Sequence, residues 1–472
     1  MKCIDVDVAI VGAGSAGMSA YKAARAHTDK LVVIEQGPYG TTCARVGCMP
    51  SKLLIAAAGT AHVIDGSAGF GIEVAGRRID GAAVMARVRR ERDRFVGFVL
   101  DTVDGWPEAH RLQGRARFLA PGVLCVNDDL RVNAARIVIA TGATPNIPAG
   151  WRERLGDRLI VNDDVFEWTT LPDSVAVVGT GVVGLELAQA LHRLGVRVRL
   201  FGRGGRAGPL TDPVMQSAVK AWLQTTLPYS GNASDLDARR EGEGIVVEWR
   251  DERQAPHREH FDYLLAAAGR RPALSGLDLD KADIPLDDKG IPRFDRDTCR
   301  ISDTPVFIAG DADNDRPLLH EAADEGRIAG RNAGRYPDVR AETRRTPLNI
   351  VFTDPQMAMA GASHGELTSS GVAFAWGEAS FADQGRARVM GRNQGVIRVY
   401  GDRADGRILG AELFGPDVEH LAHLLAWSIQ RGDRVSDALA CPFYHPVLEE
   451  GLRSALQGLA RALRDQAGGS PP

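Results

Sequence analysis

The sequence predicts an α/β fold with two Rossmann-like units and a smaller α+β region toward its C-terminal end. Three observations lead to this prediction. An apolar run followed by a glycine-rich turn and helix-forming residues occurs twice, at residues 6–17 and 175–194. Such turns stop after about Pro347, where short strand-like runs and helices follow. The length of 472 residues corresponds to about three domains at roughly 150 residues each.

Each Rossmann-like unit is expected to bind a dinucleotide at its glycine turn. The first glycine permits the bend, the second lets the main chain approach a pyrophosphate, and the third allows close packing of helix on strand. The helix N-terminus then faces the phosphate charge. The glycines are Gly12, Gly14 and Gly17 in the first unit and Gly179, Gly181 and Gly184 in the second. Two such turns indicate electron transfer between two dinucleotides, most simply a flavin and a nicotinamide.

The residue that ends the second strand differs between the two units. In the first unit, residues 30–34 lead to Glu35, whose carboxylate can accept both ribose hydroxyls of a dinucleotide without a 2′-phosphate. In the second unit the corresponding strand leads to Gly202, and Arg203 and Arg206 follow. The missing carboxylate slightly favours NADP over NAD, although arginine supplies 50 of the 57 basic residues and both nucleotides stay open.

Composition and charge exclude several classes of protein. The chain has 57 basic and 61 acidic residues and a net charge of −4, which is no signature of nucleic-acid or anionic-membrane binding. No run approaches 18 consecutive apolar residues, so no membrane span is expected. Acidic residues within positions 1–7 interrupt the apolar core that a signal peptide needs. The cytoplasm is therefore the expected compartment.

Cys43 and Cys48 form the one closely spaced pair among six cysteines. Two thiols five positions apart can close a small, reducible disulfide that suits exchange rather than scaffolding. A structural zinc site needs four ligands, and no second pair exists, so no metal is expected. Two incidental buried thiols are the alternative, and the position just beyond the first dinucleotide unit favours a redox pair.

The segment around these cysteines, Gly-Thr-Thr-Cys-Ala-Arg-Val-Gly-Cys-Met-Pro-Ser-Lys at residues 40–52, resembles the redox-active segment of the flavin-dependent pyridine nucleotide–disulfide oxidoreductases. This family includes dihydrolipoamide dehydrogenase, glutathione reductase and mercuric reductase. Further matching segments lie at residues 140–145, 266–272, 309–311 and 445–450. Within 266–268, alanine stands where threonine is usual. Residues 319–326 look more like the dihydrolipoamide dehydrogenase branch than the glutathione reductase branch.

The resemblance implies a role for each thiol and for the base. Cys48 would be the thiol nearest the flavin, and Cys43 would exchange with the substrate sulfur. His445 would be the general base that takes a proton from an incoming dithiol, because the thiolate and not the thiol is the nucleophile. Glu450 would orient His445 and raise the basicity of its ring. In the family this histidine serves the partner subunit's active site, which implies a homodimer.

The resemblance also implies which residues contact the two cofactors, FAD and NAD or NADP. Lys52 and Glu186 would form an ion pair beside the flavin and nicotinamide, and Asp311 would contact the sugar chain of the flavin. The other cofactor-binding positions in the matching motifs are Thr141, Gly142, Gly269 and Gly310. The implied division is an FAD-binding domain at 1–150 with the cysteine pair, an NAD(P)-binding domain at 151–272, a second FAD-binding part at 273–346, and a dimerisation domain at 347–472.

The expected reaction converts a small dithiol of the lipoamide type to a disulfide through Cys43 and Cys48, the flavin and then NAD(P), in either direction. Three alternatives stay open: an NADPH-dependent reductase of another low-molecular-weight disulfide, a diaphorase or quinone reductase, and a non-catalytic flavin-bound redox sensor. Docking into a 2-oxoacid dehydrogenase complex also stays open.

The tail at 467–472 is expected to be flexible and lacks the terminal cysteine pair usual in mercuric reductase.

Overall fold

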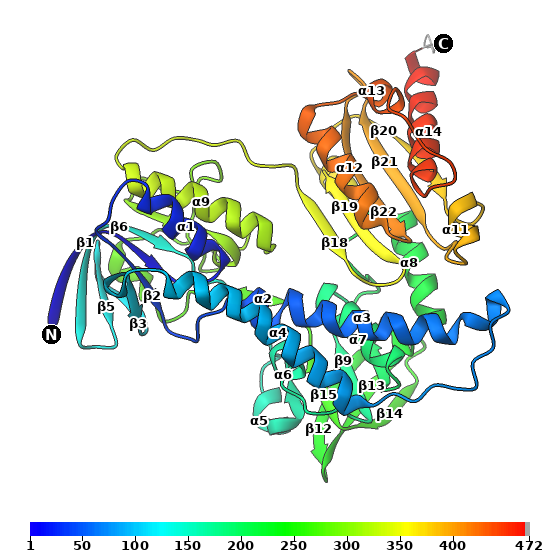
Figure 1. Cartoon of the computed structure of the whole chain (residues 1–472), viewed down its shortest axis with the longest axis horizontal. Helices are drawn as coiled ribbons and strands as arrows, with labels where there is room; N and C mark the ends of the chain where they lie inside the picture. The colour runs from blue at the N-terminus through cyan, green and yellow to red at the C-terminus, as the bar shows by residue number, and fades with distance from the viewer. Residues whose placement is uncertain (468–472) are drawn as a thin grey trace.

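The computed structural model describes residues 1–467 of the chain (Figure 1). Within this range no helix is long and apolar enough to cross a membrane. Apart from position 467, the tail for which we expect flexibility lies outside the described residues.

The first Rossmann-like unit is a mainly parallel sheet that two separate parts of the chain complete. Its strand order is β3-β2-β1-β6-β5-β4, and β17 adds to β6 in parallel. Residues 8–11 of β1 are all buried, as a parallel strand covered on both faces requires. Helices α1 and α9 lie side by side over one face of this sheet (Figure 1). The elements are β1 (Lys2–Val11), α1 (Ser15–Arg25), β2 (Leu31–Glu35), α2 (Thr42–Val46), α3 (Cys48–Asp65), α4 (Gly81–Asp104), β3 (Arg111–Gln113), β4 (Ala116–Ala120), β5 (Val123–Val126), β6 (Leu130–Ile139), β17 (Val306–Ile308) and α9 (Leu319–Arg335).

The second unit is inserted between β6 and β17. Its parallel sheet has the order β11-β10-β9-β15-β8, and an antiparallel sheet β12-β13-β14 extends from it. The elements are α5 (Trp151–Leu155), β8 (Leu159–Ile160), α6 (Asn162–Val165), β9 (Ser174–Val178), α7 (Val182–Arg193), β10 (Arg197–Phe201), α8 (Pro213–Thr226), β11 (Tyr229–Ser230), β12 (Ser234–Glu241), β13 (Gly244–Arg250), β14 (Pro256–Phe261) and β15 (Tyr263–Ala266).

The chain enters and leaves the second unit at one place, because β7 (Ala143–Pro145) and β16 (Arg270–Pro272) pair antiparallel. Two of the motifs that resemble the family therefore lie against each other. The predicted limits at positions 150, 272 and 346 fall at or close to connections between these sheets, and as limits they stay a prediction.

The C-terminal unit is an antiparallel sheet of order β18-β19-β22-β21-β20. Leu452, Leu456 and Leu459 of its last helix are buried among the sheet residues and lie in the core of this unit. The elements are β18 (Leu348–Val351), β19 (Gln356–Gly361), α10 (His364–Ser369), β20 (Phe374–Ser380), α11 (Gly385–Val389), β21 (Val396–Asp402), β22 (Ile408–Gly415), α12 (Val418–Arg431), α13 (Val435–Leu439) and α14 (Glu449–Ala467).

Candidate active site and dinucleotide cavities

The glycine turn between β1 and α1 has the geometry of a pyrophosphate cradle. Gly12 has a φ of +107°, and a Cβ there would lie 2.3 Å from the Ala140 carbonyl oxygen. A Cβ on Gly17 would lie 1.9 Å from the Gly12 carbonyl oxygen. Both positions therefore need glycine for the fold itself. Gly14 differs, because a Cβ there would meet no atom of residues 1–467 within 4 Å, which leaves its face open to a ligand.

The cavity in front of this turn fits FAD. Glu35 lines it at the end of β2, and its carboxylate accepts the main-chain N–H groups of Ala13 at 2.7 Å and Gly37 at 2.8 Å. Thr141 and Gly142 also line it. The Thr141 Oγ1 is buried and has no hydrogen-bond partner among the described residues. An open cradle, a carboxylate and an unpartnered hydroxyl are what a flavin dinucleotide would use.

Gly310 and Asp311 follow β17, the strand that returns to the first sheet. Gly310 has a φ of +71°, and its N–H donates to the buried Glu325 carboxylate at 2.8 Å. A Cβ on Gly310 would lie 3.0 Å from the Cβ of Ala16 on α1, so the segment packs directly against the helix of the glycine turn. Burial raises the pKa of Asp311 above its ordinary value.

The second glycine turn repeats the first one in detail. Gly179 has a φ of +124°, and a Cβ there would lie 2.1 Å from the Ala267 carbonyl oxygen. A Cβ on Gly184 would lie 1.9 Å from the Gly179 carbonyl oxygen, whereas Gly181 is open for 4 Å. In both turns, therefore, the first and third glycines leave no room for a Cβ, whereas the second glycine faces open space.

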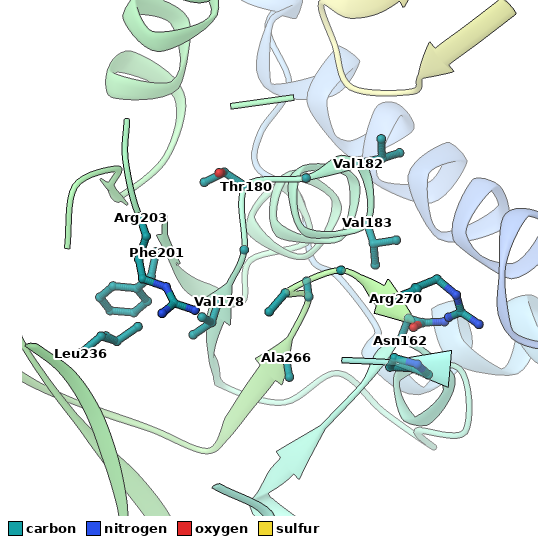
Figure 2. A pocket seen from close by; sticks show the side chains of 17 residues that line it. Asn162, Val178, Thr180, Val182, Val183, Phe201, Arg203, Leu236, Ala266 and Arg270 are labelled. Atoms are coloured by element: carbon teal, nitrogen blue, oxygen red, sulfur yellow. The ribbon is translucent and has the colours of Figure 1, made fainter. Parts of the chain in front are cut away.

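A cavity lies in front of this second turn (Figure 2). Gly202 and Arg203 line it at the end of β10, and Gly269 and Arg270 line it on the other side. The structure does not bring Arg206 into the lining. Its main-chain carbonyl instead accepts the Thr180 hydroxyl at 2.7 Å. Of the two arginines singled out from the sequence, Arg203 alone faces the cavity, because the chain turns away at Gly204 and Gly205, which both have positive φ.

Cys43 and Cys48 lie on consecutive helices, and both are free thiols in this structure. Cys43 lies in α2, and Cys48 is the first residue of α3, where the helix dipole favours a thiolate. The Cys43 side chain hydrogen-bonds to Cys48 and, with the Lys52 ammonium, lowers the pKa of Cys48 to about 6, against the opposing effect of burial. The same hydrogen bond and burial raise the pKa of Cys43. At neutral pH the negative charge of the pair therefore resides on Cys48.

Lys52 lies one helical turn after Cys48 and joins three parts of the chain. Its Nζ contacts the Glu186 carboxylate of α7 at 2.8 and 3.0 Å. It also lies 4.7 Å from the centre of the Phe352 ring, just after β18. The Phe352 N–H donates to Glu186 Oε1 at 2.9 Å. The ion pair predicted from the family resemblance is thus present, and it is held from the C-terminal unit as well.

His445 and Glu450 form the second predicted pair. The His445 Nδ1 lies 3.0 and 3.1 Å from the two Glu450 oxygens. The other ring nitrogen, Nε2, takes no part in this contact with Glu450. The His445 side chain is 78% exposed. The pair lies at the start of α14, well separated from α2 in Figure 1. Within one chain the structure therefore does not bring this histidine to the two cysteines.

Sequence reasoning missed two residues that support the site. Phe352 belongs to no motif, and only the fold brings it to Glu186. Asn162 is buried at the start of α6, where it lines the second cavity, and its side-chain amide donates to the Val46 carbonyl between the two cysteines at 2.8 Å. Asn162 directly follows Val161, the N-cap of α6, and nothing in the sequence marks this long-range contact.

Two dinucleotide cradles, a polarised thiol pair and an ion pair between them define a class of protein: an oxidoreductase that moves electrons between thiols and two dinucleotides. Comparison with known proteins agrees. The family model described as pyridine nucleotide-disulphide oxidoreductase matches residues 6–326, and the model for the dimerisation domain of that family matches residues 348–456.

Several relatives of similar length are dihydrolipoyl dehydrogenases. Dihydrolipoyl dehydrogenase 2 of Haloarcula marismortui is 28% identical, over 98% of this chain and 97% of that protein. Dihydrolipoyl dehydrogenase of Thermus scotoductus is 29% identical, over 96% and 97%. Among solved structures, LpdA from Mycobacterium tuberculosis has a TM-score of 0.80 at 24% identity, covering 96% of this chain and 99% of that one. The flavoprotein disulfide reductase RclA from Escherichia coli has a TM-score of 0.79 at 22% identity, with the same coverage.

This chain belongs to the pyridine nucleotide-disulphide oxidoreductase family. It is an FAD-dependent disulfide oxidoreductase that resembles dihydrolipoyl dehydrogenase, and its cofactors are FAD and NAD or NADP. The predicted fold class and family are thereby confirmed, and the dimerisation domain indicates a homodimer.

Proposed function

We propose that the protein oxidises a small dithiol of the lipoamide type to its disulfide, and can run in reverse, with Cys43 and Cys48 as the exchanging pair. The observation that carries the proposal is the polarity of this pair: the pKa of Cys48 is lowered to about 6, and that of Cys43 is raised. One sulfur is thus suited to remain a thiolate inside the site, and the other is suited to exchange protons and bonds with a substrate.

The residues of the chain account for each step of the exchange. A substrate thiolate attacks Cys43 in the Cys43–Cys48 disulfide, the S–S bond breaks, and Cys48 leaves as a thiolate. The second substrate thiol then loses its proton to His445 and attacks the mixed disulfide, which releases the substrate disulfide and Cys43. His445 returns that proton to Cys43. Two electrons have passed from substrate to protein.

Glu450 and the Lys52–Glu186 pair exchange no bonds with the substrate; they act on His445 and on Cys48. Glu450 holds His445 by Nδ1 and fixes the orientation of its ring. Lys52 favours the Cys48 thiolate. Bound FAD would supply two-electron transfer between that thiolate and the nicotinamide. Lys52 and Glu186 lie between the thiol helix and the second glycine helix, where they would orient the two cofactors toward each other.

The dimer completes this proposal, because His445 would reach the thiols of the partner rather than those of its own chain. The domain limits at 150, 272 and 346 and the individual cofactor contacts belong to the same proposal. The cytoplasmic location expected from the sequence stays a prediction.

A steady-state assay of the purified flavoprotein tests the function. With dihydrolipoamide and NAD or NADP we expect turnover, and we expect Cys43→Ser to abolish it. Cys3→Ser is the matched control, because Cys3 is an exposed thiol on β1 outside the site. No turnover with dihydrolipoamide, together with turnover of another small disulfide, would replace the substrate and keep the family. Full activity of Cys43→Ser would contradict the exchange mechanism and favour a diaphorase.

A further inference from the structure

The end of β10 carries no acidic residue for a nucleotide ribose. The position that Glu35 occupies in the first unit is Gly202 in the second. Among residues 1–467, no aspartate or glutamate lines the second cavity, and its charged side chains are Arg203 and Arg270. Figure 2 shows Arg203 next to Phe201 at one end of the cavity, and Arg270 at the other end. The end near β10 is therefore positively charged.

Thr180 explains why an acid cannot simply replace Gly202. A Cβ on Gly202 would lie 2.8 Å from Thr180 Cγ2 and 3.0 Å from the Gly231 carbonyl oxygen. The first unit offers an internal comparison, because its Ala13 occupies the position of Thr180. There the small side chain leaves room, and the Ala13 N–H donates to the Glu35 carboxylate at 2.7 Å. In the second unit the Thr180 side chain occupies that room.

Thr180 also fixes the loop that carries the arginine. Its hydroxyl donates to the Arg206 carbonyl at 2.7 Å, and its own carbonyl accepts the Gly208 N–H at 2.8 Å. These two bonds hold residues 203–208 across the mouth of the glycine turn. With the loop pinned in this way, Arg203 lines the cavity and Arg206 does not.

We propose that Thr180 and Gly202 together exclude a ribose-binding carboxylate, and that Arg203 takes its place as the partner of a 2′-phosphate, so that the nucleotide used is NADP(H). An arginine favours a phosphate dianion, whereas a carboxylate at this position would repel it. This assignment of NADP(H) deepens the proposed function. It rests on the proposed function in one respect, namely that the second cavity holds the nicotinamide dinucleotide.

Direct binding tests the inference without turnover. Isothermal titration of the FAD-loaded protein compares adenosine 2′,5′-bisphosphate with AMP, which lacks the 2′-phosphate. We expect the bisphosphate to bind about tenfold or more tightly, as a charge-assisted contact gives, and Arg203→Ala to remove this advantage. Arg206→Ala is the matched control and keeps it. Equal affinities in the unaltered protein, or an equal loss in Arg206→Ala, would overturn the assignment of Arg203.

A second set of variants tests Thr180. Gly202→Glu alone should lose the bisphosphate advantage without gaining affinity for AMP, because Thr180 keeps its carboxylate out of place. Thr180→Ala combined with Gly202→Glu should bind AMP more tightly than the bisphosphate and accept NADH. If Gly202→Glu alone behaves like the double variant, the role of Thr180 is refuted. These outcomes do not depend on the dithiol, so failure of dihydrolipoamide as substrate leaves them intact.

Discussion

Glu186 contacts Lys52 at 2.8 Å across 134 positions of the chain. Glu186 is almost fully buried, and Lys52 is one-third exposed. The pair links the helix that begins with Cys48 to the helix that begins at the second glycine turn. Its two charges act on Cys48 in opposite senses.

The two charges predict opposite effects on the titration of Cys48. Glu186 raises and Lys52 lowers the pKa of Cys48, so Glu186→Gln should move it below about 6, and Lys52→Gln should move it above. The measurement is the pH dependence of the long-wavelength absorbance that a thiolate beside a flavin gives in the two-electron-reduced protein. Glu167→Gln, on an exposed pair with Arg92, is the control. Shifts in the same direction for both variants would contradict the ion-pair account.

The identity of the two thiols predicts different spectra for two serine variants. Cys48→Ser should abolish the long-wavelength absorbance, whereas Cys43→Ser should keep it, because the negative charge resides on Cys48. In the unaltered protein the lowered pKa means that the thiolate is present above about pH 6, and the band is lost as the pH falls through 6. A band that persists in Cys48→Ser would reverse the assignment of the two sulfurs.

The His445–Glu450 pair predicts a loss that is specific to dithiol chemistry. His445→Ala should lower the rate of dithiol oxidation by about 10²- to 10⁴-fold, as loss of a general base does, and Glu450→Gln should lower it less. Reduction of an artificial acceptor by the nicotinamide should remain largely intact. Equal losses in both assays would exclude a role as base.

Mixed dimers test whether His445 acts on the cysteines of the partner chain. Mixed dimers of Cys43→Ser and His445→Ala chains contain one site with both functional groups if the histidine acts across the interface. We expect activity in the mixture of two inactive proteins. Random mixing makes half of the dimers mixed, and each has one complete site of two, so about a quarter of the activity of the unaltered dimer should return. A mixture that forms mixed dimers and stays inactive would place the base elsewhere.

The glycine turns predict two kinds of variant. Gly14→Ala should fold normally but bind FAD poorly, because its Cβ would meet no atom of the described chain within 4 Å and would project into the cavity proposed for the dinucleotide. Gly17→Ala should instead lower the free energy of unfolding by about 1–3 kcal/mol or more, since its Cβ would lie 1.9 Å from the Gly12 carbonyl oxygen. Thermal unfolding and the ratio of FAD to protein distinguish them. Normal FAD content in Gly14→Ala would remove the cradle from the account.

Most predictions made from the sequence depended on local motifs. The glycines of the two turns and the cysteine pair could be found because each depends on neighbours within a few residues. Glu35 could be found because it ends the strand that follows the first glycine turn. The Lys52–Glu186 pair came from family resemblance, since no spacing rule joins positions 134 residues apart.

What the sequence could not provide depends on packing between distant segments. Phe352 reaches Glu186 only because the C-terminal sheet packs on the second unit, and Asn162 reaches Val46 only across a domain contact. Arg203 and Arg206 looked equivalent in the sequence. The conformation of two glycines between them and the hydroxyl of Thr180 decide which of them lines the cavity.

In the proposed reaction, Cys43 and Cys48 receive the electrons of a dithiol before any nicotinamide is involved. The most direct measurement mixes the oxidised flavoprotein with dihydrolipoamide under anaerobic conditions, without NAD(P), and follows the absorbance of the flavin in time. Long-wavelength absorbance should increase on mixing in the unaltered protein and in Cys3→Ser. In Cys43→Ser, whose Cys48 thiolate gives this band before the dithiol is added, the spectrum should not change. An unchanged spectrum in the unaltered protein, or an equal response in Cys43→Ser, would contradict the proposed reaction.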